Sequence, residues 1–126
     1  LFTILSGWAV RYKILPEGRR QILNFALTGD LLGIQASVLR ELDHSVDALT
    51  PIRLCVFPRQ RIWELYRNHP GLSHDLTWIA AREESILASH LANVGQRPAA
   101  GRVAYIAMCL FDRARRARSR SSCVQR

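Results

Sequence analysis

The spacing of apolar residues changes at Pro58, and this change constrains the fold more than any other feature of the sequence. Before Pro58, large apolar side chains alternate with polar ones, as in segment 8–14, where Arg11 and Lys13 fall between apolar neighbours. A period of two is typical of half-buried strands. After Pro58, apolar residues recur every three or four positions, as on one side of a helix. We therefore expect an α+β protein with strands in its first half and helices in its second.

Turn residues divide the first half into short strands. Pro16 and Gly18 are suited to a tight turn, which joins segments 8–14 and 19–27 into a hairpin. Many short strands separated by Gly and Pro favour an antiparallel β-roll or jelly-roll sandwich. The expected strands cover residues 2–5, 8–14, 19–27, 45–49 and 52–57, with a short helical turn over 35–42.

Three helices are expected in the second half. A short one lies around residues 61–66 and ends before the Asn-His-Pro sequence at 68–70. A long one covers about 72–94, with Gly95 as its C-cap, and a last one has Pro98 in its first turn.

The long helix carries two apolar tracks at heptad spacing. One comprises Leu72, Ile79 and Ile86, and the other comprises Ala80, Leu87 and Val94. Heptad spacing predicts pairing with a partner helix in a homodimer. Glu83 and His90 interrupt the pattern, and an amphipathic helix packed on its own β-domain fits it equally well. The predicted dimer contacts are Leu72, Ile79, Ile86, Leu87 and Val94.

Positive charge is concentrated at the C-terminal end. The net charge of the 126 residues is +8. Residues 1–96 hold ten Lys and Arg against nine Asp and Glu, whereas residues 97–126 hold eight Arg against Asp112 alone. Such an end suits weak contacts with nucleic-acid phosphates, although a solvated tail explains the last dozen residues as well. The candidate phosphate ligands are Arg113, Arg115 and Arg116, followed by Arg118, Arg120 and Arg126.

Several functional classes find no support in the sequence. Cys55, Cys109 and Cys123 form no CxxC pair, and the four histidines lack the spacing of a metal site. No nucleophile–base motif, P-loop or useful carboxylate pair occurs, so we expect neither a metal nor an enzyme. No apolar run of eighteen or more residues exists, which excludes a membrane-spanning helix from the expected structure. We expect a cytoplasmic protein with reduced thiols.

Six segments, taken in order, resemble the Crp/Fnr family of bacterial transcription regulators over residues 2–113. They are LSGWAVRY at 5–12, PEGRRQI at 16–22, GDLLG at 29–33, HSVDAL at 44–49, AREE at 81–84 and GRVA at 101–104. The resemblance implies a cyclic-nucleotide-binding-like β-roll sensor over 1–68, lacking its N-terminal start. It further implies a dimerisation helix over 69–96, and over 97–126 the start of a truncated DNA-binding region with a basic tail.

The resemblance also implies an effector pocket around the Gly-Asp turn, whose backbone N–H groups surround a concave space. Its candidate residues are Gly29, Asp30, Gly33, Ile34, Gln35, His44 and Ser45. Members that bind a cyclic nucleotide have a Glu where Ile34 and Gln35 stand, and an Arg at the position of His44. A mostly neutral histidine does not replace the two charge-assisted bonds of an Arg fork. We therefore expect weak or absent cAMP binding, with a cavity that is either filled by side chains or holds another small molecule.

Iron–sulfur members of the family place one cluster ligand at the position of Cys55, but their other ligands come from an N-terminal cysteine group that these 126 residues do not contain. One thiolate does not hold a cluster. We expect Cys55 to be a buried strand residue, and no cofactor.

The function expected from the resemblance is the sensor and dimerisation portion of a regulator whose full-length form binds DNA. Ligand or redox state would bias the geometry of the dimer. Nothing after Arg113 resembles a recognition helix. The alternatives are a stand-alone effector-binding or protein-interaction module without a DNA role, and, third, a cupin-type enzyme.

Overall fold

The computed structural model describes residues 1–123, with side chains as far as Ala117. Strands occupy the first part of the chain and helices the second. The strands are β1 (Phe2–Ser6), β2 (Ala9–Ile14), β3 (Arg20–Ala26), β4 (Leu31–Leu32), β5 (Ser45–Ala48) and β6 (Arg53–Val56). The helices are α1 (Ile34–Leu39), α2 (Ile62–Asn68) after a 3₁₀ turn (Arg59–Arg61), α3 (Pro70–Gln96) and α4 (Ala99–Cys123).

The strands form two antiparallel sheets of three strands each, in the orders β4-β1-β6 and β3-β2-β5. The core lies where apolar side chains of both sheets meet, at Ile4, Ala9, Ala26 and Leu32. This arrangement confirms the predicted α+β class and its antiparallel strands.

Two predicted turns occur where glycine permits a positive φ. Gly18 has φ 78° and donates its N–H to the carbonyl of Leu15, which closes the predicted β2–β3 hairpin. Gly7 has φ 95°, and a Cβ there would lie 2.4 Å from the carbonyl oxygen of Pro51. Only glycine fits between β1 and β2 at this point, because both the conformation and the space exclude a side chain.

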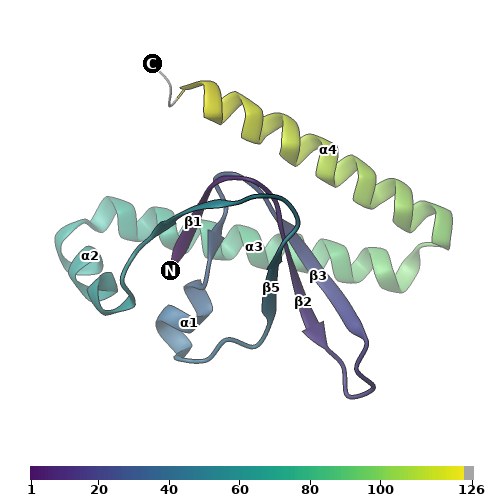
Figure 1. The fold of residues 1–126 in the computed structure, drawn as a ribbon, viewed down its shortest axis with the longest axis horizontal. Coiled ribbons are helices and arrows are strands. Elements are labelled where there is room, and N and C mark those ends of the chain that lie inside the picture. The colour runs from purple at the N-terminus through teal and green to yellow at the C-terminus, as the bar shows by residue number, and fades with distance from the viewer. Residues whose placement is uncertain (124–126) are drawn as a thin grey trace.

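The two long helices differ from the prediction at their ends. Gly95 is not a C-cap, because α3 continues through Gln96 and is capped by Arg97 in an extended conformation. The ring of Pro98 disfavours helical geometry in the residue before it, which explains this end. The helix α4 then folds back from α3 in the opposite direction (Figure 1) and continues to Cys123. The backbone over 114–123 is therefore helical, in keeping with the strong helix propensity of Ala and Arg.

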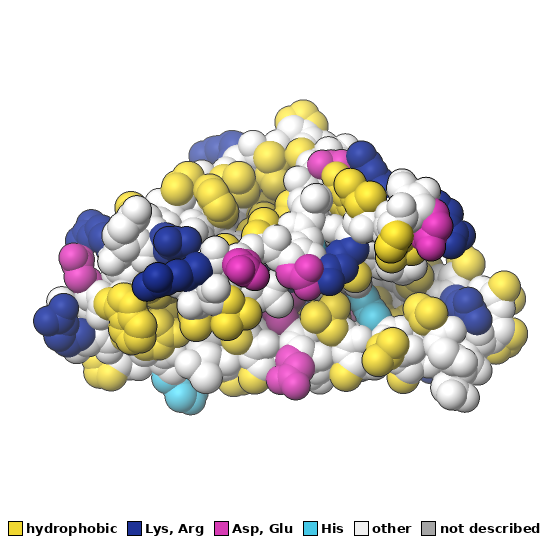
Figure 2. Space-filling view, turned by 90° about the horizontal axis from the view of Figure 1, so that it is seen from below, with side chains coloured by type: hydrophobic (Ala, Val, Ile, Leu, Met, Phe, Trp, Pro, Cys, Tyr) yellow, Lys and Arg dark blue, Asp and Glu magenta, His cyan; other side chains and the backbone are white. Residues whose placement is uncertain are grey.

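Many large apolar side chains of this chain are exposed to solvent. On the face shown in Figure 2, hydrophobic side chains gather in several clusters between charged ones.

Cys55 is exposed, contrary to the expectation of burial. The reason is that β6 is an edge strand whose four residues all face solvent. No helix within the described part of the chain is long and apolar enough to cross a membrane.

Candidate functional site

A cavity of about 390 Å³ lies among β1, β2, β4, β5 and α1. Its walls are mostly apolar and include Ala9, Leu32, Val46 and Ile52. The polar side chains that line it are Ser37, His44 and Arg59. No Asp or Glu is among its lining residues, so the cavity offers an apolar chamber with polar groups of neutral or positive character.

The structure brings only part of the predicted pocket together. Gly33 and His44 line the cavity, whereas the other five candidates do not. Successive residues of a strand point to opposite faces, so Ser45 turns away while His44, Val46 and Ala48 face the cavity. Ile34 and Gln35 begin α1, which presents Ala36 and Ser37 instead. The candidates outside the cavity are Gly29, Asp30, Ile34, Gln35 and Ser45.

His44 lies in an environment that favours its neutral form. Partial burial lowers the pKa of His44 below its usual 6.5, and the positive charges of Arg11 and Lys13 lower it further. Asp43 opposes these effects. Arg59 is then the formal charge at the cavity, and its guanidinium donates to the carbonyl of Ala36 at 3.5 Å. Sequence reasoning missed Arg59, because no motif marks it and only the fold places it beside α1.

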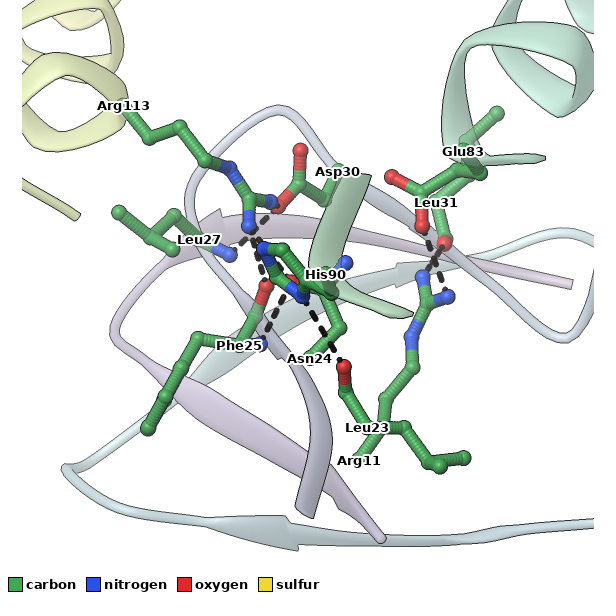
Figure 3. Close-up of polar contacts among 10 residues, drawn as sticks. All are labelled: Arg11, Leu23, Asn24, Phe25, Leu27, Asp30, Leu31, Glu83, His90 and Arg113. Atoms are coloured by element: carbon green, nitrogen blue, oxygen red, sulfur yellow. Dashed lines mark hydrogen bonds and ion pairs between the residues drawn. The ribbon is translucent and has the colours of Figure 1, made fainter. Parts of the chain in front are cut away.

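Asp30 faces the helices instead of the cavity (Figure 3). Its Oδ2 accepts the N–H of Leu27 at 2.7 Å, which closes the Gly-Asp turn on itself. The same oxygen accepts Nη2 of Arg113, from α4, at 2.5 Å. Nη1 of Arg113 donates to Oδ1 of Asn24 at 2.9 Å and to the carbonyl of Phe25 at 2.8 Å. One guanidinium thus fastens α4 to the end of β3 and to the turn.

The turn has a second face, which lines the cavity. Leu32 and Gly33 lie in the cavity wall, two and three residues after Asp30. The side chains of Asp30 and Arg113 are 19% and 14% exposed. Because the pair is largely shielded from water, it is held more firmly than a surface ion pair. Segment 27–33 therefore connects the cavity wall to α4.

Two further contacts fasten α3 to the strands (Figure 3). Nη1 of Arg11 donates to Oε2 of Glu83 at 2.9 Å, while its Nη2 donates to the carbonyl of Leu31 at 2.8 Å. Nδ1 of His90 lies 3.3 Å from the carbonyl of Leu23. Glu83 and His90 interrupt the heptad tracks because they belong to the side of α3 that meets its own β-domain.

The predicted dimer residues divide between two sides of α3. Ile79 and Ile86 are half-buried on the side of Glu83 and His90. Leu72, Leu87 and Val94 are exposed, and so is Leu91, which sequence reasoning did not single out. Leu87, Leu91 and Val94 are spaced by four and three residues, so they share one side of the helix. Ile79 and Ile86 thus pack within the chain, while Leu72 and the second track lie open to solvent.

The predicted phosphate ligands also have different environments. Arg113 is engaged by Asp30 and is not presented to solvent, in contrast to its predicted role. The guanidinium of Arg115 is exposed and lies 3.8 Å from Asp112. Arg116 is exposed on α4. The side chains of Arg118, Arg120 and Arg126 lie outside the described residues. No group of three or more His, Cys, Asp or Glu within those residues is arranged to hold a metal ion.

Comparison with known proteins places these features in context. A family model described as "Cyclic nucleotide-binding domain" matches residues 1–69. The nitrogen fixation regulation protein FixK of Bradyrhizobium diazoefficiens is 35% identical over 103 residues, covering 82% of this chain and 43% of that protein. The transcriptional activatory protein AadR of Rhodopseudomonas palustris is 32% identical over 113 residues, covering 90% of this chain and 46% of that protein.

Solved structures show the same fold. FixK2 from Bradyrhizobium japonicum superposes with a TM-score of 0.64 at 23% identity, over 77% of this chain and 48% of that one. A putative regulator of the Crp/Fnr family from Eubacterium rectale reaches a TM-score of 0.68 at 15% identity, over 78% and 47%. This chain therefore spans less than half the length of these relatives.

The cavity lining holds one cationic side chain, Arg59, and no carboxylate that would accept a ribose hydroxyl. A cyclic phosphate is bound best by a cationic side chain, and a ribose hydroxyl is bound best by a carboxylate acceptor. His44 is held toward its neutral form, and no carboxylate is among the lining residues. Ile34 and Gln35 are outside the lining altogether.

Proposed function

Because the chain belongs to the Crp/Fnr family and carries its cyclic nucleotide-binding domain, we propose that it is the sensor and dimerisation part of a DNA-binding transcription regulator. In this proposal residues 1–68 sense an effector, 69–96 pair two copies, and 97–126 begin the region that reaches DNA. The chain is a regulator and not an enzyme. The matched relatives, which bear regulator and activator names, support this assignment.

One observation carries the proposal: segment 27–33 borders the cavity on one side and binds Arg113 on the other. A molecule in the cavity presses on Leu32 and Gly33, and any shift of the turn moves Asp30. Asp30 in turn moves Arg113 and the helix to which it belongs. The sensor thereby reports occupancy of its cavity as a change in the position of α4.

The open side of α3 supports pairing of two copies. Leu87, Leu91 and Val94 form an apolar stripe without cover in this chain, and each remains at least 39% exposed. A second copy buries this stripe best through its own α3, because the spacing repeats along both helices. Sedimentation equilibrium at micromolar concentration should give twice the mass of the chain. The mass of one chain at these concentrations would contradict the dimer.

The effector is a small molecule other than a cyclic nucleotide. With His44 at the position of the phosphate-binding Arg and no carboxylate in the lining to bind a ribose, cAMP binding should be weakened by roughly a hundredfold or more, since each hydrogen bond to a charged group contributes about 1.5–3 kcal/mol. Titration calorimetry with cAMP tests this part. A low-micromolar dissociation constant would assign phosphate binding to His44 and overturn it.

A further inference from the structure

The facing sides of α3 and α4 carry three arginines around two cavities. Arg82 from α3 and Arg113 and Arg116 from α4 line both of them. The cavities measure about 230 Å³ and about 330 Å³. The lining carboxylates are Asp112 in the first and Asp30 in the second. Positive charge therefore exceeds negative charge in each cavity.

Two of the three guanidinium groups have no carboxylate partner among the described residues. Arg113 is bound to Asp30, while Asp112 lies beside Arg115. Within the described residues, neither Arg82 nor Arg116 makes an ion pair. The guanidinium of Arg82 lies over the ring of Trp78, 5.6 Å from its centroid, and this contact orients it. Like charges around one partly open cavity raise its positive potential and attract an anion.

Hydroxyl groups complete the surroundings of the smaller cavity. Ser85 and Ser89 line it from α3, and Tyr105 lines it from α4. The hydroxyl of Ser89 already donates to the carbonyl of Ser85 at 2.9 Å, which leaves the hydroxyls of Ser85 and Tyr105 as the candidate donors. Guanidinium forks combined with hydroxyl donors are the groups that proteins use to bind phosphate oxygens. A volume of about 230 Å³ admits a phosphate group with its attached atoms but not a strand of nucleic acid.

We propose that this cavity binds an oxyanion of the phosphate type, held between Arg82 of α3 and Arg116 of α4. The ligand is free phosphate or the phosphate group of a small metabolite. Its negative charge joins the two helices beside the Arg113–Asp30 contact and so stabilises the folded-back position of α4. The site is separate from the β-roll cavity and depends neither on the effector nor on the dimer.

Calorimetric titration of the 126-residue chain with inorganic phosphate, at constant ionic strength set by NaCl, tests the site. The variants Arg82→Gln and Arg116→Gln should each weaken phosphate binding about tenfold or more, as expected for loss of a charge-assisted hydrogen bond. Arg115→Gln is the matched control, because it removes the same charge from the neighbouring position and Arg115 lines neither cavity. It should bind phosphate within about twofold of the unmodified chain. Circular dichroism verifies that each variant is folded.

Two further arms separate the sources of the anion. A phosphate monoester such as glycerol phosphate that binds more tightly than inorganic phosphate, with the same dependence on Arg82 and Arg116, identifies a metabolite. Equal or tighter binding of inorganic phosphate identifies the free ion. Equal losses in all three variants would reveal only general charge attraction and overturn the proposal. Absence of phosphate binding would also overturn the proposal. So would a result in which the Arg82 and Arg116 substitutions weaken binding of duplex DNA but not binding of phosphate.

Discussion

At the scale of single residues, Arg113 shows how much one side chain can connect. Its Nη1 and Nη2 groups donate to a carboxylate, an amide oxygen and a backbone carbonyl on residues 83 to 89 positions away. An arginine suits this role because its planar fork serves several acceptors at once. Removing it leaves Asp30 largely buried without its cation, which is costlier than losing a surface charge.

We expect Arg113→Ala to lower the free energy of unfolding by about 2–3 kcal/mol, which is below the roughly 3–5 kcal/mol for breaking a fully buried pair because both groups retain some exposure. Urea denaturation of both proteins measures this difference. Arg115→Ala is the control and should change stability by less than about 0.5 kcal/mol, since its side chain is mostly exposed. Equal losses in the two variants would show that the contact with Asp30 has no special weight.

His44 leads to a prediction about pH. Burial and the charges of Arg11 and Lys13 lower its pKa below 6.5, so His44 binds a proton more weakly in the folded chain than in the unfolded chain. The contribution of His44 to stability is therefore complete above pH 6.5 and declines as the pH falls from 6.5 toward the lower folded pKa. An NMR titration should place the midpoint of His44 below 6.5, and His44→Gln should reduce the loss of stability on acidification. A midpoint above 6.5 would contradict the environment described for this residue.

The sequence could reveal local patterns at this scale but not partners. The alternation around His44 and the turn glycines predict where strands begin and end. The pairing of Asp30 with Arg113 leaves no local trace, because residues 83 positions apart meet only through the folding of α4. Asp30 consequently looked like a pocket residue, although its carboxylate faces away from the pocket.

At the scale of elements, α3 explains why its heptad pattern allowed two interpretations. One side carries Glu83 and His90 to the strands, and a neighbouring side carries the open stripe at Leu87, Leu91 and Val94. Periodicity detects both apolar tracks without telling which of them faces the protein's own sheets. The same limit applies to the end of α4, because its basic, Ser-rich sequence has no apolar period that would indicate a helix.

We expect Leu91→Glu to abolish or strongly weaken dimerisation while the chain remains folded, because Leu91 is 75% exposed and lies in the proposed seam. Ala81→Glu is the matched control, since it places the same charge at an exposed position on another side of α3. Sedimentation equilibrium of both variants makes the comparison. Ile86→Glu is less informative, because Ile86 is half-buried within the chain and its change affects folding too. A Leu91→Glu protein that still sediments as a dimer would place the interface elsewhere.

At the scale of the whole molecule, the chain is a β-roll with two long helices fastened to it by a small number of polar contacts. Arg11–Glu83 and His90–Leu23 hold α3, whereas Arg113 holds α4. Ile106 and Leu110 of α4 also line a cavity together with Leu23, Phe25 and Val94. In the proposed mechanism, a change in the turn at 27–33 would shift α4 through Arg113.

The basic end of the chain leads to the last prediction, which concerns DNA. Arg113 is occupied by Asp30, and Arg115 and Arg116 belong to a helix that continues straight to Cys123 without a further element among the described residues. Side chains on such a helix can meet phosphates, but phosphate contacts carry no information about sequence. We expect this chain to bind duplex DNA weakly, without sequence preference, with an affinity that falls steeply as salt rises. Selection from random duplexes at physiological salt measures this directly. Enrichment of a palindromic site would show instead that residues 97–126 bind DNA sequence-specifically. The boundary proposed between the sensor and the DNA-binding region would then be wrong.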